Sequence, residues 1–195
     1  MGKNFMLFGL LAMGVVWGPA MGWAQSGNTR TSIYVGTATY TYGDAETVGS
    51  SFGLGWGVSL SDSLLFSISG TSHATEGNYQ DGNTSYPISA NTISGSTGMT
   101  HFLSTNRDAA IVPFYEAGFS VTSYQIDFTY PGSGLGTTSG TAPGAFGSLG
   151  VEMRMGSNIT FIPQYRINAH NIKTEAGDAA FLRSDGLLIS LRIRS

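Results

Sequence analysis

The second half of the sequence alternates between apolar and polar side chains, residue by residue. Between residues 145 and 155 the odd positions are mostly apolar, whereas the even positions include Glu152 and Arg154. The alternation recurs over 159–171 and 183–194. Since successive side chains of a β-strand point to opposite faces, each segment predicts a strand with one oily and one polar face.

The connections between these segments alternate in length. Short polar turns are predicted at 61–63, 104–108 and 156–158, and longer loops at 75–89, 129–143 and 172–182, with a shorter one at 43–47. The segments between them predict eight strands, near 30–42, 48–60, 64–75, 90–103, 109–128, 143–155, 159–171 and 183–194. A small hairpin within 75–92 would raise the count to ten, and the facing of the strands near 31–42 and 90–103 stays open.

The composition narrows the fold class. Charged residues make up only 11% of the chain, against roughly 25% in ordinary soluble domains. Gly, Ser and Thr are abundant, and no long apolar run follows the N-terminal segment. These features predict an all-β fold, a closed antiparallel up-and-down transmembrane barrel, because an open sheet edge in hydrocarbon would leave backbone groups unpaired. A net charge of −3 without a basic patch argues against a nucleic-acid partner.

The N-terminal segment has the pattern of a cleavable signal peptide. Lys3 precedes an apolar run from Phe5 to Trp17, and the small residues Gly22 and Ala24 follow at the spacing that a signal peptidase accepts. The run is shorter than the ~20 residues of a membrane-spanning helix. We therefore expect residues 1–24 to be removed and residues 25–195 to form the barrel domain.

The chain resembles the small bacterial outer-membrane barrels, such as OmpX, the opacity proteins and the transmembrane domain of OmpA. The resemblance rests on the signal peptide, the alternating strands, the turn and loop pattern, and the segment Ser184–Leu191, which is similar to the β-signal of these proteins. It implies a location in the bacterial outer membrane, contact with lipid and lipopolysaccharide, recognition by the barrel assembly machinery, and a monomeric state.

Placing the oily faces on lipid sends several charged side chains inward. An eight-stranded barrel is just wide enough for side chains to fill it, and buried charges need partners. We expect an interior ion-pair network that plugs the barrel, and a gated ion path is the alternative. The predicted members are Glu116, Glu152, Arg154, Arg166, Arg192 and Arg194.

Aromatic residues lie near the ends of the predicted strands, among them Tyr40, Phe102 and Phe114. Such a distribution is typical of the aromatic girdles at the two membrane interfaces. The alternative is the ordinary β-propensity of aromatic residues.

The predicted longer loops carry Gly, Ser, Thr, Asn and an excess of acidic residues. Because binding usually resides on loops above a rigid scaffold, we expect a non-enzymatic protein with a role in surface interaction or adhesion, or in envelope integrity. No cofactor, metal site or catalytic residue is predicted. The alternatives are a narrow porin-like pore, a soluble periplasmic lipocalin-like binder with inward oily faces, and a lipid-modifying enzyme. Some small outer-membrane barrels are lipid A deacylases that use a histidine, a nearby serine and an acidic residue. The resemblance to these enzymes is weak here, because Ile172 occupies the position after His170 where their serine would lie.

Overall fold

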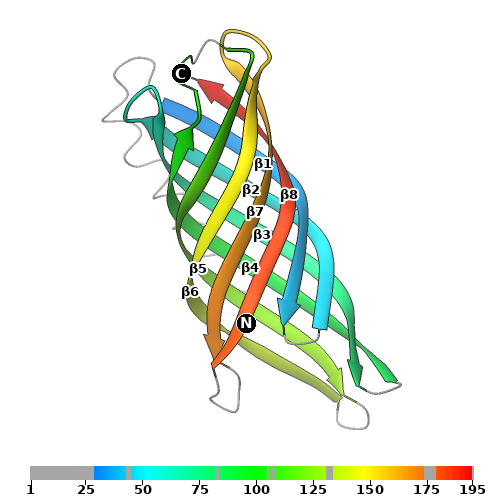
Figure 1. Cartoon of the computed structure of the whole chain (residues 1–195). Helices are drawn as coiled ribbons and strands as arrows, with labels where there is room; N and C mark the ends of the chain where they lie inside the picture. Colours follow the sequence, from blue (N-terminus) through cyan, green and yellow to red (C-terminus); the bar gives the residue numbers. More distant parts are fainter. Residues whose placement is uncertain are drawn as a thin grey trace.

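The computed structural model describes residues 29–42, 45–81, 84–104, 106, 109–130, 134–173 and 179–194. The predicted signal peptide lies outside these residues. The described part of the chain forms one closed antiparallel barrel of eight strands (Figure 1). Within these ranges, no helix has both the length and the hydropathy needed to cross a membrane.

Each strand pairs with its neighbours in the sequence, and β1 pairs with β8 to close the barrel. The strands are β1 (Thr29–Tyr42), β2 (Ala45–Ser59), β3 (Leu64–Asp81), β4 (Thr84–Phe102), β5 (Ile111–Tyr130), β6 (Gly134–Arg154), β7 (Ile159–Lys173) and β8 (Ala179–Arg194). The predicted fold class and the count of eight are therefore confirmed. The alternative of ten strands is wrong, because β3 and β4 continue as one hairpin through the segment 75–92.

The barrel has two distinct ends. The connections 60–63, 103–110 and 155–158 lie at what we call the turn end, at the top of Figure 1, where β1 begins and β8 ends. At the opposite end, which we call the hairpin end, β1, β3, β5 and β7 end, and β2, β4, β6 and β8 begin.

The strands reach much further toward the hairpin end than the sequence predicts. The β3–β4 ladder extends to Asp81 and Thr84, and the β5–β6 ladder to Tyr130 and Gly134. The predicted loops 75–89 and 129–143 are consequently wrong in type, since most of their residues continue the barrel wall.

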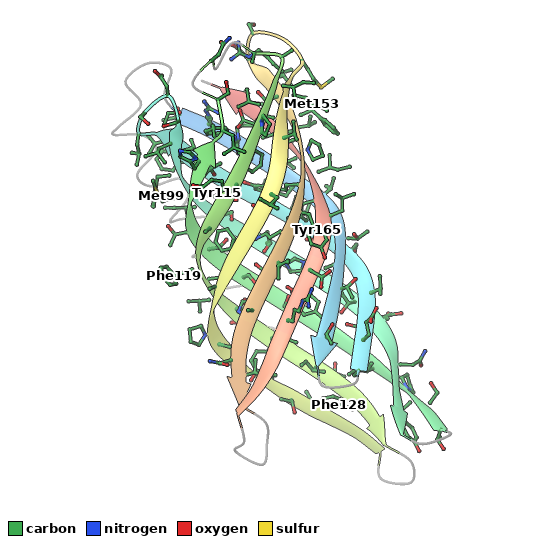
Figure 2. All side chains as sticks on the ribbon, viewed as in Figure 1. Met99, Tyr115, Phe119, Phe128, Met153 and Tyr165 are labelled. Carbon is green, nitrogen blue, oxygen red and sulfur yellow. The ribbon has the colours of Figure 1, made fainter. Side chains whose placement is uncertain are left out.

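An apolar band surrounds the wall on the side of the turn end. Its side chains point away from the barrel and are exposed, as at Met99, Tyr115 and Phe119 (Figure 2). Other exposed apolar members are Ile33, Val35, Phe52, Val121, Leu149, Ile167, Leu187, Ile189 and Leu191. Inside the barrel at this level the side chains are largely Ser, Thr, Gln, Glu and Arg. This is the opposite of a lipocalin-like binder, whose oily faces would point inward.

The two faces exchange character toward the hairpin end. There the interior holds buried apolar residues such as Ile88 and Ile126, while their outward neighbours on the same strands are polar, as at Asn91 and Asp127. The period of two is unbroken, and only its polarity is reversed. This reversal explains why these segments lacked the pattern of an oily outer face and were predicted as loops.

One edge of the wall is unpaired in the described ladders. β6 pairs with β5 along its whole length, but with β7 only from Gly144 onward. Within the described ladders, the segment from Gly134 to Pro143 is paired with β5 alone, and it includes the exposed residues Ser139 and Thr141. The barrel is closed at the level of the apolar band, and from there to the hairpin end the described ladders contain no pairing between β6 and β7.

Candidate functional site

The barrel interior has three layers. A polar middle layer lies between an apolar cluster at each end. The hairpin-end cluster comprises Ala38, Tyr40, Ala45, Ile88, Ala90, Tyr124, Ile126, Ala142, Ile172 and Leu182, and the turn-end cluster comprises Leu65, Phe102, Val112, Phe114 and Ile162. Two pockets among the described residues measure about 30 and 10 Å³.

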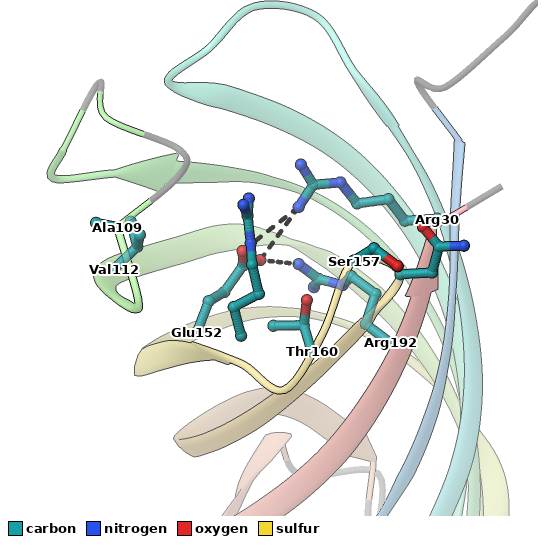
Figure 3. Close-up of a pocket in the computed structure, with 9 residues that line it drawn as sticks. Arg30, Ala109, Val112, Glu152, Ser157, Thr160 and Arg192 are labelled. Carbon is teal, nitrogen blue, oxygen red and sulfur yellow. Dashed lines mark hydrogen bonds and ion pairs between the residues drawn. The ribbon is translucent and has the colours of Figure 1, made fainter.

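Glu152 organises the charged groups at the turn end (Figure 3). Its carboxylate accepts a hydrogen bond from Arg192 and forms an ion pair with Arg30, whose Nη1 lies 3.3 Å from Oε1. The Nε of Arg192 also donates to the Ser32 hydroxyl at 3.1 Å. All three charged residues are buried, so one carboxylate serves two guanidinium groups. Glu152 and Arg192 are both members of the interior network predicted from the sequence, which did not assign pairs.

Arg30 is the member that the sequence prediction missed. It occupies the second position of β1, a strand whose facing was left open. Its guanidinium lies 5.8 Å from the centroid of the Phe102 ring. A signal was nevertheless present, because Ile33 and Val35 at odd positions require Arg30 and Ser32 to face inward.

Arg166 occupies the polar middle layer. Its Nη2 donates to the Ser96 hydroxyl at 2.9 Å and its Nε to the Asn168 side-chain oxygen at 3.2 Å. Its guanidinium also stacks on the ring of Phe146. The side chain is thus held by three strands, namely β4, β6 and β7.

Glu116 is the carboxylate of this middle layer. It accepts hydrogen bonds from Ser67 at 2.6 Å and from Ser148 at 3.3 Å. Glu116 also interacts electrostatically with Arg166. Glu152 instead pairs with Arg30 and Arg192 at the turn end. The predicted network is therefore divided into a turn-end group and a middle group, joined by no described ion pair.

One predicted member of the network is exposed, and for another the prediction is not tested. Arg154 is exposed at the rim of the turn end, where β6 ends, and it lines a pocket there together with Glu152 and Arg192. The backbone of Arg194 pairs with that of Arg30, and its side chain lies outside the described part of the structure.

The hairpin-end cluster contains an uncharged hydroxyl pair. The Tyr40 hydroxyl lies 2.7 Å from that of Thr92, and both residues are buried. Tyr40, Phe102 and Phe114 all lie inside the barrel, so for these residues the predicted interfacial girdle is wrong: they fill the ends of the lumen.

The histidines are dispersed. His73 and His170 are buried in the interior, where the Nε2 of His170 lies 3.3 Å from the Thr122 hydroxyl, and His101 is half-buried on the outer face beside Tyr115. Within the described ranges, no group of three or more His, Asp or Glu side chains could hold a metal ion.

The outer face of the hairpin end is polar and mainly acidic among the described residues. Glu46 and Glu76 are exposed, and Asp127 accepts a hydrogen bond from Thr137 at 2.7 Å. Asp185 pairs with Arg183 at 3.4 Å. The acidic residues predicted for loops are therefore partly fixed on the strands.

Comparison with solved structures identifies the fold. The Neisserial surface protein A (NspA) superposes with a TM-score of 0.59 at 18% identity, covering 86% of this chain and 97% of that one. OprG from Pseudomonas aeruginosa gives 0.58 at 9% identity, covering 86% and 97%. Ail, the attachment invasion locus protein of Yersinia pestis, gives 0.50 at 11% identity, covering 87% and 100%.

The chain has the fold of the small outer-membrane barrels. The resemblance found in the sequence is thereby confirmed at the level of fold. No family model matches the sequence, and no curated protein matches it significantly.

Proposed function

We propose that this protein is an integral outer-membrane barrel with a closed interior, which presents a rigid polar wall outside the cell for surface interaction. The observation that carries the proposal is the exchange of faces along the strands. The exposed apolar band is suited to contact the hydrocarbon core of a membrane. At the hairpin end the outer face is polar and the interior is apolar, which is the arrangement of a protein in water. One chain with both arrangements is suited to cross a membrane and to stand above it.

The orientation follows from the same exchange. Small outer-membrane barrels have short periplasmic turns and longer extracellular extensions. The strands extend beyond the apolar band at the hairpin end, so we place that end outside the cell and the turn end in the periplasm. The band would contact membrane lipid and lipopolysaccharide, and the segment Ser184–Leu191 within β8 would be read by the barrel assembly machinery. We propose a monomer.

The three-layered interior supports a binding or structural role over that of a pore. An ion would have to pass two apolar clusters, and desolvating a charge in such surroundings is very unfavourable. Two pockets among the described residues measure only about 30 and 10 Å³. We therefore propose that the extracellular wall, not the lumen, carries the activity, and that this activity is non-enzymatic.

The extracellular wall differs from a set of flexible loops. Its polar groups, among them Glu46, Glu76 and Asp127, are carried on paired strands, and a rigid surface loses little entropy on binding. The excess of carboxylates favours a ligand with cationic groups.

Register-matched hairpin shortening tests the proposal. Residues 79–86 are replaced by Asn-Gly, which joins the paired residues Asn78 and Pro87, and residues 129–135 are replaced likewise between Phe128 and Gly136. We expect both variants to fold, shown by heat-modifiable migration of the outer-membrane fraction, and to lose binding of cells to host or abiotic surfaces.

The control replaces Glu46, Glu76 and Asp127 by the corresponding amides at full hairpin length. Weaker binding in this variant assigns the interaction to charge. If adhesion is unchanged in the shortened variants while sensitivity of the cells to detergent rises, the role is envelope integrity and the surface-interaction proposal fails.

A further inference from the structure

The smaller of the two pockets described above lies where β1 and β8 meet, at what we call the seam. It measures about 10 Å³ and is lined by residues from both faces of the wall. Thr37 and Asp185 occupy outward positions of β1 and β8, whereas His73 and Arg166 belong to the interior. We propose that this recess binds a single water molecule, which enters through the seam and hydrates the polar middle layer. The inference goes beyond the proposed surface interaction, which concerns the outer wall.

The size and the lining of the recess select its occupant. A cavity holds one water molecule when about 10–15 Å³ is open to the centre of that molecule, and empty cavities are apolar. The recess reaches this size and is polar, because Thr71, Ser184 and Arg166 line it beside His73. A hydrated ion or an organic group would need a larger space. Water therefore matches both the volume and the chemistry.

His73 carries a polar atom that needs a partner. The residue is 7% exposed, and its ring packs edge-on against that of Tyr40 at a centroid distance of 5.6 Å. Its Nδ1 has no hydrogen-bond partner among the described residues. The hydroxyl of Ser51, which lies opposite His73 in the β2–β3 ladder, is likewise buried without one. Leaving such atoms unbonded is unfavourable, and ordered water is their usual partner.

The same need recurs elsewhere in the polar middle layer. The Ser120 hydroxyl and the Nδ1 of His170 lie on either side of Gly144 in the ladders of β5, β6 and β7. A Cβ on Gly144 would collide with that nitrogen, so the imidazole ring leans over the glycine. These two atoms, the side-chain nitrogen of Gln164 and the hydroxyl of Ser190 are buried without a partner in the described part of the chain. The layer thus offers several positions for water.

The seam is the locally weak part of the wall beside the recess. The described β1–β8 ladder pairs Gly36 with Leu188 and Thr39 with Asp185, but it contains neither of the two pairs between them. Gly186 lies in this gap and has no side chain to cover it. A stretch with fewer backbone hydrogen bonds opens more readily than its fully paired neighbours. Water can therefore pass here during brief local openings.

The recess also lies at a height where water is available. On β8 the outer face changes from Leu187 and Ile189, which belong to the apolar band, to Asp185. Asp185 accepts a hydrogen bond from the Tyr165 hydroxyl and pairs with Arg183. Such a polar group marks the boundary between hydrocarbon and water. Water from outside reaches the recess at this boundary without crossing either apolar cluster of the interior.

The test detects water beside the His73 ring by NMR. The chain is folded into lipid nanodiscs, and transfer of magnetisation from water to the carbon-bound ring protons of its histidines is followed over time. The signal of His73 is assigned by its loss in His73→Gln. We expect transfer to this ring in the unaltered chain. Absence of transfer would overturn the water site.

Filling the recess should remove the water. Ala38 lines the recess, so the larger side chain of Ala38→Val should abolish transfer to the His73 ring. Ala142→Val is the matched control, because Ala142 is a buried alanine of the same apolar cluster but does not line the recess. Transfer should persist in this control. Equal transfer in the two variants would contradict the assignment of the water to this recess.

A pair of threonine variants decides the same question if Ala38→Val does not migrate as a folded barrel. Thr71→Val removes one hydroxyl of the recess at nearly constant volume and should lower the transfer to His73 about two- to tenfold, the effect of one lost hydrogen bond. Thr100→Val removes a buried hydroxyl away from the recess and should leave the transfer unchanged. Equal effects of the two variants would overturn the site.

A reversible cross-link tests the route of entry. The chain has no cysteine, so an introduced pair can form a single disulfide. Thr37→Cys with Leu187→Cys spans the gap in the seam, and its oxidation should slow the transfer to His73 until the disulfide is reduced again. Ile33→Cys with Leu191→Cys spans a paired part of the same ladder and is the control. If both pairs behave alike, water enters elsewhere and the proposed route is wrong. The assay uses no surface partner, so its failure is independent of the proposed surface interaction.

Discussion

The guanidinium carbon of Arg166 lies 3.7 Å from the centroid of the Phe146 ring, within the polar middle layer of the barrel. This close cation–π contact sits among hydrogen bonds to Ser96 and Asn168. Burying a guanidinium is unfavourable unless its donors are satisfied and a compensating charge is near. Here the compensating charge is the carboxylate of Glu116.

Replacing Arg166 with Met should lower the free energy of unfolding by about 2–4 kcal/mol, because Glu116 then loses its compensating buried cation. In a Glu116→Gln background the same replacement should be less destabilising, since no carboxylate is left uncompensated. Denaturant unfolding in detergent of the four proteins of this cycle measures the difference. An equal loss in both backgrounds would show that the two side chains are not coupled.

The ring of Phe146 fits because Gly98 on β4 and Gly118 on β5 have no side chain that would occupy its place. A Cβ at Gly118 would lie 2.7 Å from a Phe146 ring carbon and 2.2 Å from the backbone oxygen of Thr97. Gly118→Ala should therefore destabilise the barrel by about 1–3 kcal/mol. Gly147→Ala is the control, because the nearest atom to its Cβ is 3.9 Å away. Equal unfolding midpoints for the two variants would contradict this packing.

The apolar band predicts the position of the membrane. Phe119 is 75% exposed on the outer face of β5, so Phe119→Arg should hinder insertion by about 2–4 kcal/mol. Ser123 faces outward on the same strand, two outward positions nearer the hairpin end, and Ser123→Arg should insert normally. Heat-modifiable migration after folding into lipid vesicles compares them. Equal insertion of both variants would place the membrane elsewhere.

The wall at the level of the band could be predicted from sequence because one-residue alternation is a local signal. Leu187, Ile189 and Leu191 against Ser190 and Arg192 specify both the strand and its facing. The count of eight strands followed from the turns between such segments. The alternation also assigned Glu152 and Arg192 to the inward face, and the structure shows that these two residues pair there.

The hairpin end could not be predicted in the same way. There the inward positions hold small residues such as Ala90 and Ala142, and the outward positions hold polar residues. The strands therefore lack the apolar outer face that the sequence analysis looked for. Which face is apolar depends on whether lipid or water surrounds the wall, and this depends on height above the membrane. Likewise, the separation of Glu116 from the Glu152 group depends on the stagger of the strands, which no local pattern contains.

The hairpin-end cluster behaves as a water-soluble core if the exchange of faces is correct. Ile126→Ala removes buried apolar volume from this cluster and should lower the free energy of unfolding by about 2–4 kcal/mol. Asn91→Ala, on the exposed outer face of the neighbouring strand, should change it by less than about 0.5 kcal/mol. Denaturant unfolding in detergent measures both. A larger loss for Asn91→Ala would place the core on the wrong face.

The free edge of β6 predicts a local difference in backbone protection. From Gly134 to Pro143 this strand bonds to β5 alone within the described ladders. In an antiparallel pair about half of the amides of a strand point toward each neighbour, so about half of those in this segment should exchange with solvent quickly. The opposite residues of β5, from Val121 to Ile126, are paired on both sides and should be protected. Hydrogen exchange followed by NMR in detergent resolves the two strands, and uniform protection along β6 would show that β7 closes the edge in solution.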